Sequence, residues 1–478
     1  MQTKGDLPKT ASPFLFSRFL MDRQQKQKIH REFWHYTWLN ALGMFGFSCY
    51  ILADTYFIAK GAGVQGLTAL NLVLPVYYLF YGIAQLLTNG ATIRYAIALG
   101  RGDTKQGSQY FTLALSCVFL IGSIFSLIGI FFSPLLVATL GGREIVLEQG
   151  SVYLRTLLIA TPAFMLNTLC QGFLRNDKAP KLAMASLLIS SLMNILLDYI
   201  FVMIWAKGMF GAALATAFSP VISLMVMAPF FLYKRNNFHF DFTYLRKPNR
   251  AKATQLKLIC VTGIPAFVVE MASCVVMLVF NYLLLGLGGS LAVAAYGVVN
   301  NFAIVVVAIL NGVAQGVQPL LGNAHGSKDL LRLKILFRDA LLVAILFGAL
   351  VCAVVFLFTE ELVSLFNSDN NSELKRLAIP AMRIYFVGIL FAGANIIFAQ
   401  YFASTEHNFK AQMVTLLRAA IILVPCAVLL SSFFGIAGIW FSVLSTEVAV
   451  LIVATWLYRK DQHIKYLRYS QLSGHDLE

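Results

Sequence analysis

The sequence predicts an all-α polytopic membrane protein with twelve transmembrane helices in two pseudo-symmetric six-helix lobes. Three observations predict this fold class: an excess of apolar residues, twelve apolar segments of spanning length, and a repeat that relates the two halves of the chain. Apolar residues make up 59% of the 478 residues and charged residues only 12%, and the mean hydropathy is +0.74. Soluble domains carry roughly 45–50% apolar and about 25% charged residues. The outer face of this chain is therefore expected to meet lipid.

Twelve apolar segments lie between charged, Gly-rich or Asn-rich breaks, and a transmembrane helix needs about 20 largely apolar residues. In chain order the predicted spans are 36–58, 67–92, 109–138, 151–174, 182–204, 210–233, 258–287, 291–322, 340–366, 377–404, 411–433 and 438–457. The longest basic loop joins the sixth and seventh spans at the midpoint of the chain, where a linker is expected. The predicted organisation is a cytoplasmic arm at 1–33, a first lobe at 34–233, a cytoplasmic linker at 234–257, a second lobe at 258–458 and a cytoplasmic tail at 459–478.

Lys and Arg are distributed unevenly between the two sides of these spans. With the N-terminus inside, 29 of the 37 basic residues fall on the cytoplasmic side, 5 fall on the outer side and 3 lie within spans. Cytoplasmic loops of membrane proteins carry an excess of Lys and Arg, so both termini are expected in the cytoplasm. The net charge of +15 is then a topology signal, and no nucleic-acid partner is expected.

The two halves match each other at a nearly constant offset. At an offset of 226 residues the matches are Gly90 with Gly316, Ala98 with Ala324, Gly100 with Gly326 and Asp103 with Asp329. At 228 residues, Arg155 and Asn167 fall on Arg383 and Asn395. Six spans per half give both halves the same membrane orientation, so the repeat is parallel and a substrate cavity is expected between the lobes.

Acidic residues inside spans are the candidate functional groups, because a charge there costs at least ~2.5–3.5 kcal/mol and is usually functional. The candidates are Asp54, Asp198 and Glu270. At 1.5 Å per residue, Asp198 lies roughly 25 Å along its span, in the outer half. Asp54 comes late in the first span, which also runs outward.

Polar neighbours fall at the same depth as these two acids. Tyr50 precedes Asp54 by four residues, as Asn194 precedes Asp198, so each pair shares a helix face. Thr216 comes early in a span that runs inward, again in the outer half. We call these five residues the acid layer. An alternative is that the two acids only reach water at the outer surface, which applies more to Asp54, since the apolar run continues beyond Asp198.

Two carboxylates in an apolar lobe suit a proton near neutral pH, because burial and mutual repulsion favour the protonated form. With Asn and Thr oxygens nearby, the same layer suits Na⁺, and the residues alone do not decide between the two ions. Glu270, near mid-depth of the seventh span, is a candidate for receiving a cationic substrate or an ion. A local hydrogen bond within the bundle is the alternative for Glu270.

Several kinds of site are missing from the sequence. The seven cysteines are scattered in apolar segments without a C-x-x-C pair, which predicts small buried hydrophobes. There is no G-x-x-x-x-G-K-[ST] loop for ATP and no H-E-x-x-H zinc motif. We therefore expect no enzyme, no ATP and no cofactor beyond the coupling ion.

Six sequence segments, spread over most of the chain, are distinctive: ILADTYFI at 51–58, QGFLR at 171–175, PKLAM at 180–184, NILLDYIFV at 194–202, GMFGAALAT at 208–216 and GVQPLLG at 316–322. In these segments and their order the chain resembles the multidrug and toxic compound extrusion (MATE) family. The resemblance implies secondary active efflux, in which organic cations and other lipophilic compounds, antibiotics among them, exchange for H⁺ or Na⁺.

The resemblance also implies roles for individual residues. Asp54, Asn194, Asp198 and Thr216 match the first-lobe cation site of the family, and Tyr50 matches a tyrosine beside it. Glu270 matches a second-lobe acid that some members use. The further acid that those members carry in the tenth span is missing here, where the sequence reads AGANIIF at 392–398. That difference disfavours Na⁺ in the second lobe and favours H⁺ mildly.

Two other functions are less consistent with the sequence. A flippase for lipids or lipid-linked oligosaccharides needs a basic cavity for pyrophosphate, whereas the three candidate acids equal in number the three basic residues within the predicted spans. A membrane enzyme or receptor needs a catalytic cluster or a large soluble domain, and no loop exceeds about 30 residues. We expect a monomer in a bacterial inner membrane, with lipid and small molecules as its only partners.

Overall fold

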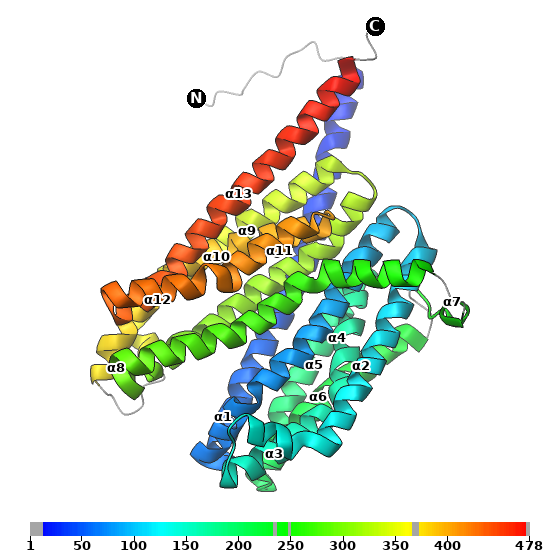
Figure 1. The fold of residues 1–478 in the computed structure, drawn as a ribbon. Coiled ribbons are helices and arrows are strands. Elements are labelled where there is room, and N and C mark those ends of the chain that lie inside the picture. Colours follow the sequence, from blue (N-terminus) through cyan, green and yellow to red (C-terminus); the bar gives the residue numbers. More distant parts are fainter. Residues whose placement is uncertain (1–12, 233–236, 247–249, 366–371, 475–478) are drawn as a thin grey trace, which may run out of the picture.

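The computed structural model describes residues 13–232, 237–246, 250–365 and 372–474, which fold into helices with no strand among them. The helices are α1 (Pro13–Gly100), α2 (Thr104–Thr139), α3 (Glu144–Ile159), α4 (Thr161–Asn176), α5 (Pro180–Asp198), η1 (Tyr199–Ile204), α6 (Gly208–Leu232), α7 (Phe242–Arg246), α8 (Arg250–Gly326), α9 (Leu330–Leu365), α10 (Ser372–Ser404), α11 (Asn408–Leu416), η2 (Leu417–Ile421), α12 (Leu423–Phe434) and α13 (Ile436–Gly474). Here η marks a π-helical segment. Figure 1 shows α2 to α6 gathered on one side and α9 to α13 on the other.

Twelve spans can be traced through these helices, as the sequence predicts. Eleven helical segments of the described residues are long and apolar enough to cross a bilayer, and the pair α3 and α4, bent by 48°, provides the twelfth. Both α1 and α8 contain two spans each, separated at Gly63 and Gly289. These glycines have φ angles of 67° and 63°, which glycine adopts without a steric penalty. They lie 226 residues apart, the same offset as the sequence repeat.

The two matching segments of the repeat form the same turn. The backbone N–H of Asp103 donates to the carbonyl of Ala98 at 2.9 Å, and that of Asp329 donates to Ala324 at 3.0 Å. Each aspartate then caps the next helix, because its carboxylate accepts a backbone N–H three residues later, at 2.9 Å in both cases. The matching residues Asp103 and Asp329 therefore cap the N-termini of α2 and α9 in the same way.

The buried apolar residues separate largely by half. One cluster contains residues between Phe280 and Leu457 together with a few from α1. The others draw almost entirely on residues between Ile58 and Phe238, joined by Tyr244 and Ile259. Each half therefore buries apolar surface of its own, and the exact boundaries of the two lobes remain a prediction.

Glycines bring the halves together at the end of the molecule where the termini lie. A Cβ on Gly90 would stand 2.0 Å from the carbonyl oxygen of Ile259, and one on Gly316 would stand 2.8 Å from Thr37 Cα. Small residues of this kind let transmembrane helices approach backbone to backbone. At the opposite end the two groups of helices lie apart in Figure 1.

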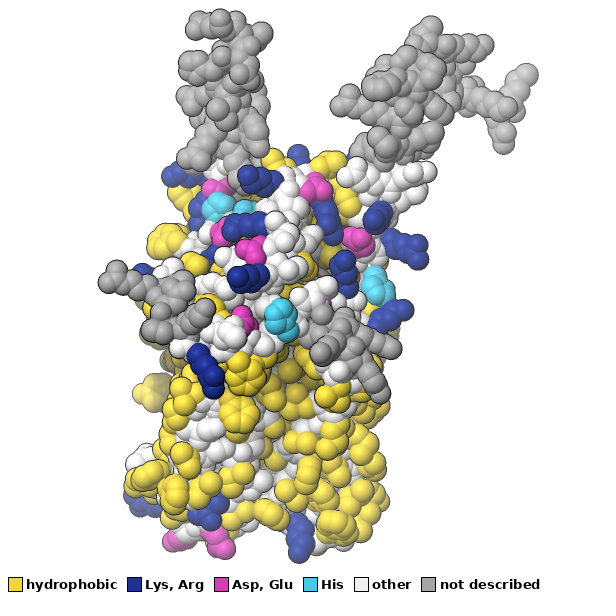
Figure 2. Space-filling view, turned by 90° about the vertical axis from the view of Figure 1, so that its right-hand side faces the viewer, with side chains coloured by type: hydrophobic (Ala, Val, Ile, Leu, Met, Phe, Trp, Pro, Cys, Tyr) yellow, Lys and Arg dark blue, Asp and Glu magenta, His cyan; other side chains and the backbone are white. Residues whose placement is uncertain are grey.

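The surface agrees with a membrane location. Figure 2 shows a broad band of hydrophobic side chains, with most Lys and Arg above it, toward the end that carries the termini, and a few at the other end. Large apolar side chains such as Phe131 and Leu357 are more than two-thirds exposed within the described residues. Apolar surface on this scale is stable against lipid tails and would aggregate in water.

Candidate functional site

The acid layer is assembled from three helices that glycines allow to pack closely. Asp54 lies on α1, Asp198 at the end of α5 and Thr216 on α6. A Cβ on Gly46 would stand 2.4 Å from the side chain of Leu188, and one on Gly61 would stand 2.1 Å from that of Val202. The first span of α1 therefore packs tightly along α5 and η1, and this contact fixes the height of Asp54 relative to Asp198.

Asp54 and Thr216 are joined directly. The Thr216 hydroxyl donates to Asp54 Oδ1 at 3.4 Å, across 162 residues of sequence. The carboxyl groups of Asp54 and Asp198 also face each other closely enough for a hydrogen bond once one of them carries a proton. The structure thus brings together the two acids and the threonine that the sequence placed at one depth.

Asp198 and Asn194 have unmet hydrogen-bonding capacity. Both are fully buried, and neither the two carboxylate oxygens of Asp198 nor the amide atoms of Asn194 have a partner among the described residues. Leaving a buried polar atom without a partner costs about 1–3 kcal/mol, and more for a charged group. The oxygen atoms among them are well suited to a proton or a small cation, which would satisfy them.

A π-helical segment begins immediately after Asp198. It runs from Tyr199 to Ile204 and continues α5 without a break. Short π-helical segments are rare and occur often at functional sites, because the wider turn changes the directions of neighbouring side chains. Asp198 therefore sits where the helix changes its winding.

Two tyrosines border the acid layer. Tyr50, which the sequence places there, packs edge-on against Phe47 with ring centroids 5.1 Å apart. Tyr153 of α3 is only 3% exposed, and its hydroxyl reaches Thr216 and lies near both acids. Nothing in the sequence distinguishes Tyr153 from the other 18 tyrosines.

A cavity of about 70 Å³ adjoins the layer and extends from Tyr50 to Arg175. Its walls are aromatic and amide-rich, with Tyr81, Asn167 and Gln171 among the lining residues. Drug-sized ligands occupy sites of about 300–1,000 Å³. A molecule of that size fits only if the helices around the cavity move apart.

Arg175 corrects the sequence prediction. The predicted fourth span ends at residue 174, which places Arg175 in the cytoplasmic loop that follows. In the structure Arg175 lies in the last turn of α4 and lines the cavity. The boundary was misjudged because a charge after an apolar run usually marks the end of a span. The loop begins two residues later, at Asp177.

Glu270 lies apart from the acid layer. It is on α8, and a Cβ on Gly82 of α1 would stand 3.3 Å from the Glu270 Cβ. Tyr78 and Tyr81 are its neighbours, so its carboxyl faces the first half of the chain at the junction.

The predicted spans hold three further acids beyond the sequence candidates: Glu360 and Glu361, both exposed near the end of α9, and Glu447. Glu447 of α13 is 6% exposed and accepts a hydrogen bond from Arg418 Nε at 2.6 Å. Asn395 also donates to this carboxylate at 2.8 Å. The predicted span 438–457 contains Glu447, so the residue itself was the available signal. Asn395 thus has an acidic partner, supplied by the twelfth span and paired with an arginine.

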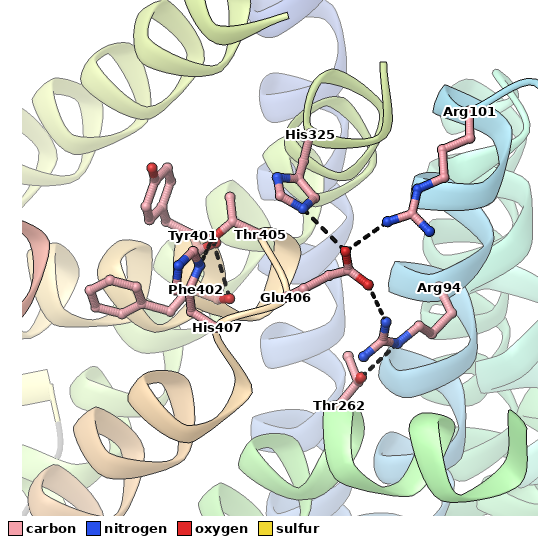
Figure 3. A network of polar contacts seen from close by, with 9 residues as sticks. All are labelled: Arg94, Arg101, Thr262, His325, Tyr401, Phe402, Thr405, Glu406 and His407. Carbon is pink, nitrogen blue, oxygen red and sulfur yellow. Dashed lines mark hydrogen bonds and ion pairs between the residues drawn. The ribbon is translucent and has the colours of Figure 1, made fainter. Parts of the chain in front are cut away.

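An ionic network closes the junction between α1, α8 and the turn after α10 (Figure 3). Glu406 accepts hydrogen bonds from Arg94 at 2.5 Å and Arg101 at 2.7 Å, and it lies 3.3 Å from His325. The hydrogen bond with His325 and the charges of the two arginines lower the pKa of Glu406 to about 2, against the opposing effect of burial. Glu406 therefore stays ionised and ties the halves together at the end that carries the termini.

No group of three or more His, Cys, Asp or Glu side chains suited to a metal occurs in the described ranges. Any Na⁺ in the acid layer would have to be held by two carboxylates with amide and hydroxyl oxygens. Oxygen ligands of this kind are those that hard cations prefer.

Comparisons with known proteins complete the description. A family model described as MatE matches residues 40–200 and 265–455. Multidrug export protein MepA of Staphylococcus saprophyticus is 24% identical over 430 residues, covering 90% of this chain and 93% of that protein. MepA from a strain of Staphylococcus aureus is 26% identical over 436 residues, with the same coverage.

Two solved structures share the fold. An outward-facing multidrug resistance MATE family transporter of the MOP superfamily has a TM-score of 0.85 at 22% identity, covering 91% of this chain and 96% of that one. A MOP superfamily transporter from Pyrococcus furiosus has a TM-score of 0.84 at 22% identity, with the same coverage. At this identity the likeness concerns the arrangement of the helices.

Proposed function

This chain belongs to the multidrug and toxic compound extrusion (MATE) family of transporters, and on that premise we propose that it exports lipophilic or cationic small molecules in exchange for H⁺. The export of several drugs is supported by the MepA relatives, which are named multidrug export proteins. Antiport, the coupling ion and the substrate range are our proposal, and the geometry of the acid layer is the basis for it. The protein is a transporter and carries out no chemical conversion.

The pairing of Asp54 with Asp198 is the observation that carries the proposal. Two facing carboxyl groups share one apolar region, and no donor among the described residues reaches Asp198. One proton between them supplies the missing donor and removes one of two like charges. Loss of that proton restores the repulsion between the two carboxylates, and this repulsion favours separation of α1 from α5.

Na⁺ is the alternative ion for this layer. Asp54, Asn194, Asp198 and Thr216 offer oxygen ligands, and Na⁺ would occupy the space between them. We rank H⁺ first, because a single shared proton supplies the donor that the facing carboxylates lack and also removes one of their like charges.

Transport by alternating access fits the junction. Contacts between the halves, including the Glu406 network, gather at the end that carries the termini. We assign this end to the cytoplasm, because Lys and Arg concentrate there. The conformation is then closed to the cytoplasm. Export requires the Glu406 network to open when substrate enters and to close again before release.

A lipid or oligosaccharide flippase remains the second candidate. Pyrophosphate headgroups need several cations around them, whereas Arg175 is the single charged residue that the described part of the chain contributes to the cavity lining. The amide and aromatic walls favour uncharged or singly charged aromatic substrates. We place the transporter as a monomer in a bacterial inner membrane.

The test is dye efflux with variants of the acid layer. Asp54→Asn and Asp198→Asn each remove a titrating group while keeping the size of the side chain. Cells that express the wild type should accumulate less of a cationic dye, and either variant should accumulate as much as cells without the protein. Glu360→Gln, at an exposed position of α9, is the matched control and should export normally. Normal efflux by both Asp variants, at equal protein levels, would overturn the assigned site.

A second experiment separates the ions. Purified protein in liposomes is given a pH gradient or a Na⁺ gradient, one at a time, and dye movement is followed. We expect movement with the pH gradient alone. Movement driven only by Na⁺ would replace H⁺ by Na⁺, and movement independent of both gradients would exclude antiport.

A further inference from the structure

Among the described residues, Arg175 is the one charged side chain that lines the cavity. It also borders a second, smaller hollow of about 10 Å³ beside Met44 and Met184, which it shares with Gln315. The side chain of Arg175, in the last turn of α4, is half-buried and borders both internal hollows.

The part of the chain that the structure describes supplies no carboxylate to Arg175. Other embedded arginines have acidic partners: Arg94 pairs with Glu406, and Arg418 pairs with Glu447. A buried charge without a partner is costly, so buried guanidinium groups are normally paired. The partner of Arg175 is therefore expected to come from outside the chain, through the cavity.

The side chains around Arg175 indicate what kind of molecule could bind it in the cavity. Tyr77 and Tyr81 line the cavity together with Arg175. They stack with ring centroids 5.5 Å apart and an angle of 12° between their planes, which gives one flat aromatic wall. An aromatic molecule resting on this wall has the guanidinium of Arg175 as a charged neighbour within the same cavity.

We propose that Arg175 is the anion-recognising residue of the substrate cavity, so that among aromatic substrates the protein favours those whose carboxylate binds Arg175, zwitterions included. The inference rests on the proposed export of small molecules from this cavity and deepens it. Arginine suits this role because its planar fork binds a carboxylate through two parallel hydrogen bonds. A purely cationic substrate gains nothing from Arg175.

The experiment compares two rhodamines that differ only in the anion. One carries a free carboxylate and the other is its methyl ester. Both are loaded into liposomes that contain the purified protein, and initial transport rates are measured over a range of dye concentrations. Wild type should transport both.

Arg175→Gln should raise the half-saturating concentration of the carboxylate dye by about tenfold or more, because a charge-assisted hydrogen bond is lost. The ester should change by less than about twofold. Arg175→Lys keeps the positive charge but loses the planar guanidinium. Its half-saturating concentration for the carboxylate dye should lie between those of the wild type and Arg175→Gln. Lys178→Gln, at an exposed position just after α4, is the matched control and should leave both dyes unaffected.

The possible results separate the two proposals. If the wild type moves neither dye, the proposed export itself fails. If the wild type moves both but Arg175→Gln weakens them equally, Arg175 has only a structural role and the inference that it recognises the carboxylate falls. Should Arg175→Gln not fold, Arg175→Lys carries the same comparison, and an equal effect on the two dyes again refutes the inference.

Discussion

Gly100 and Gly326, which match each other in the sequence repeat, contact each other across the junction of the two halves. A Cβ on Gly326 would stand 3.1 Å from Gly100 Cα and 2.2 Å from the carbonyl oxygen of Ile97. A Cβ on Gly100 would stand 2.3 Å from the carbonyl oxygen of Asn323. The contact is therefore made by backbone on both sides, and no flexible side chain is available to move away.

Gly326→Ala should destabilise this closed junction. The added methyl group overlaps a backbone oxygen, and overpacking of this kind costs about 1–3 kcal/mol. The thermal midpoint of the detergent-solubilised protein should fall. Gly297→Ala is the control, because no atom lies within 4 Å of its added Cβ. An equal thermal midpoint for both variants would mean that α1 and α8 can move apart at Gly326 without loss of stability.

Thr216→Val should slow efflux without abolishing it. The variant removes the hydroxyl that donates to Asp54 at 3.4 Å. A hydrogen bond is worth about 0.5–1.5 kcal/mol, so the initial rate of dye efflux should drop by less than about tenfold. Thr216→Ser keeps the hydroxyl and should retain most of the rate. A loss as large with Ser as with Val would show that the methyl group matters and the hydroxyl does not.

Glu406→Gln should make the protein less stable at neutral pH, by about 2 kcal/mol, because hydrogen bonds to charged partners are lost. The pKa of Glu406 is lowered from 4.5 to about 2, mainly by the hydrogen bond with His325 and then by Arg94 and Arg101. A lowered pKa stabilises the fold fully above the ordinary value, and this stability is lost as the pH falls from about 4.5 to about 2.

Thermal midpoints of wild type and Glu406→Gln, measured from neutral pH downward, test this directly. The gap between them should be constant near neutrality and should shrink below about pH 4.5. Glu360→Gln, at an exposed position, should follow the wild type throughout. A gap that is absent at neutral pH, or that grows in acid, would contradict the role of Glu406.

Glu447→Leu should destabilise the second half strongly. It leaves Arg418 buried without its partner, and breaking a buried ion pair by removing one member costs about 3–5 kcal/mol. The double variant Arg418→Met with Glu447→Leu removes both charges and should recover much of that loss. Thermal midpoints of the three proteins test the pair, and a double variant no better than the single one would show that the charges do not compensate each other.

Much of the fold could be predicted because the bilayer imposes length and composition on each span. The predicted spans 182–204 and 210–233 differ by two residues or fewer at each end from the observed Pro180–Ile204 and Gly208–Leu232. The bend between α3 and α4 was not predicted. It falls next to Pro162, whose ring is compatible with a helix start, and the apolar run continues through it without a break.

The candidate site could be predicted only in part. Depth along a span follows from counting residues, which is why Asp54, Asp198 and Thr216 were placed together. Rotation about the helix axis does not follow from counting, so the approach of Tyr153 from α3 was not foreseen. Arg175 was assigned to a loop for a related reason, since charge alone does not tell whether a residue at the end of a span faces water or an internal cavity.

The small size of the cavity has a consequence for the energetics of transport. The cavity of about 70 Å³ has room for only a few water molecules, whereas a drug-sized site of about 300 Å³ or more has room for many more. In each cycle the cavity therefore takes up water when it widens and expels that water when it narrows. The free energy of widening then depends on the activity of water outside the protein. The transport rate becomes a function of water activity, so an osmolyte too large to enter the cavity holds the protein in its narrow state.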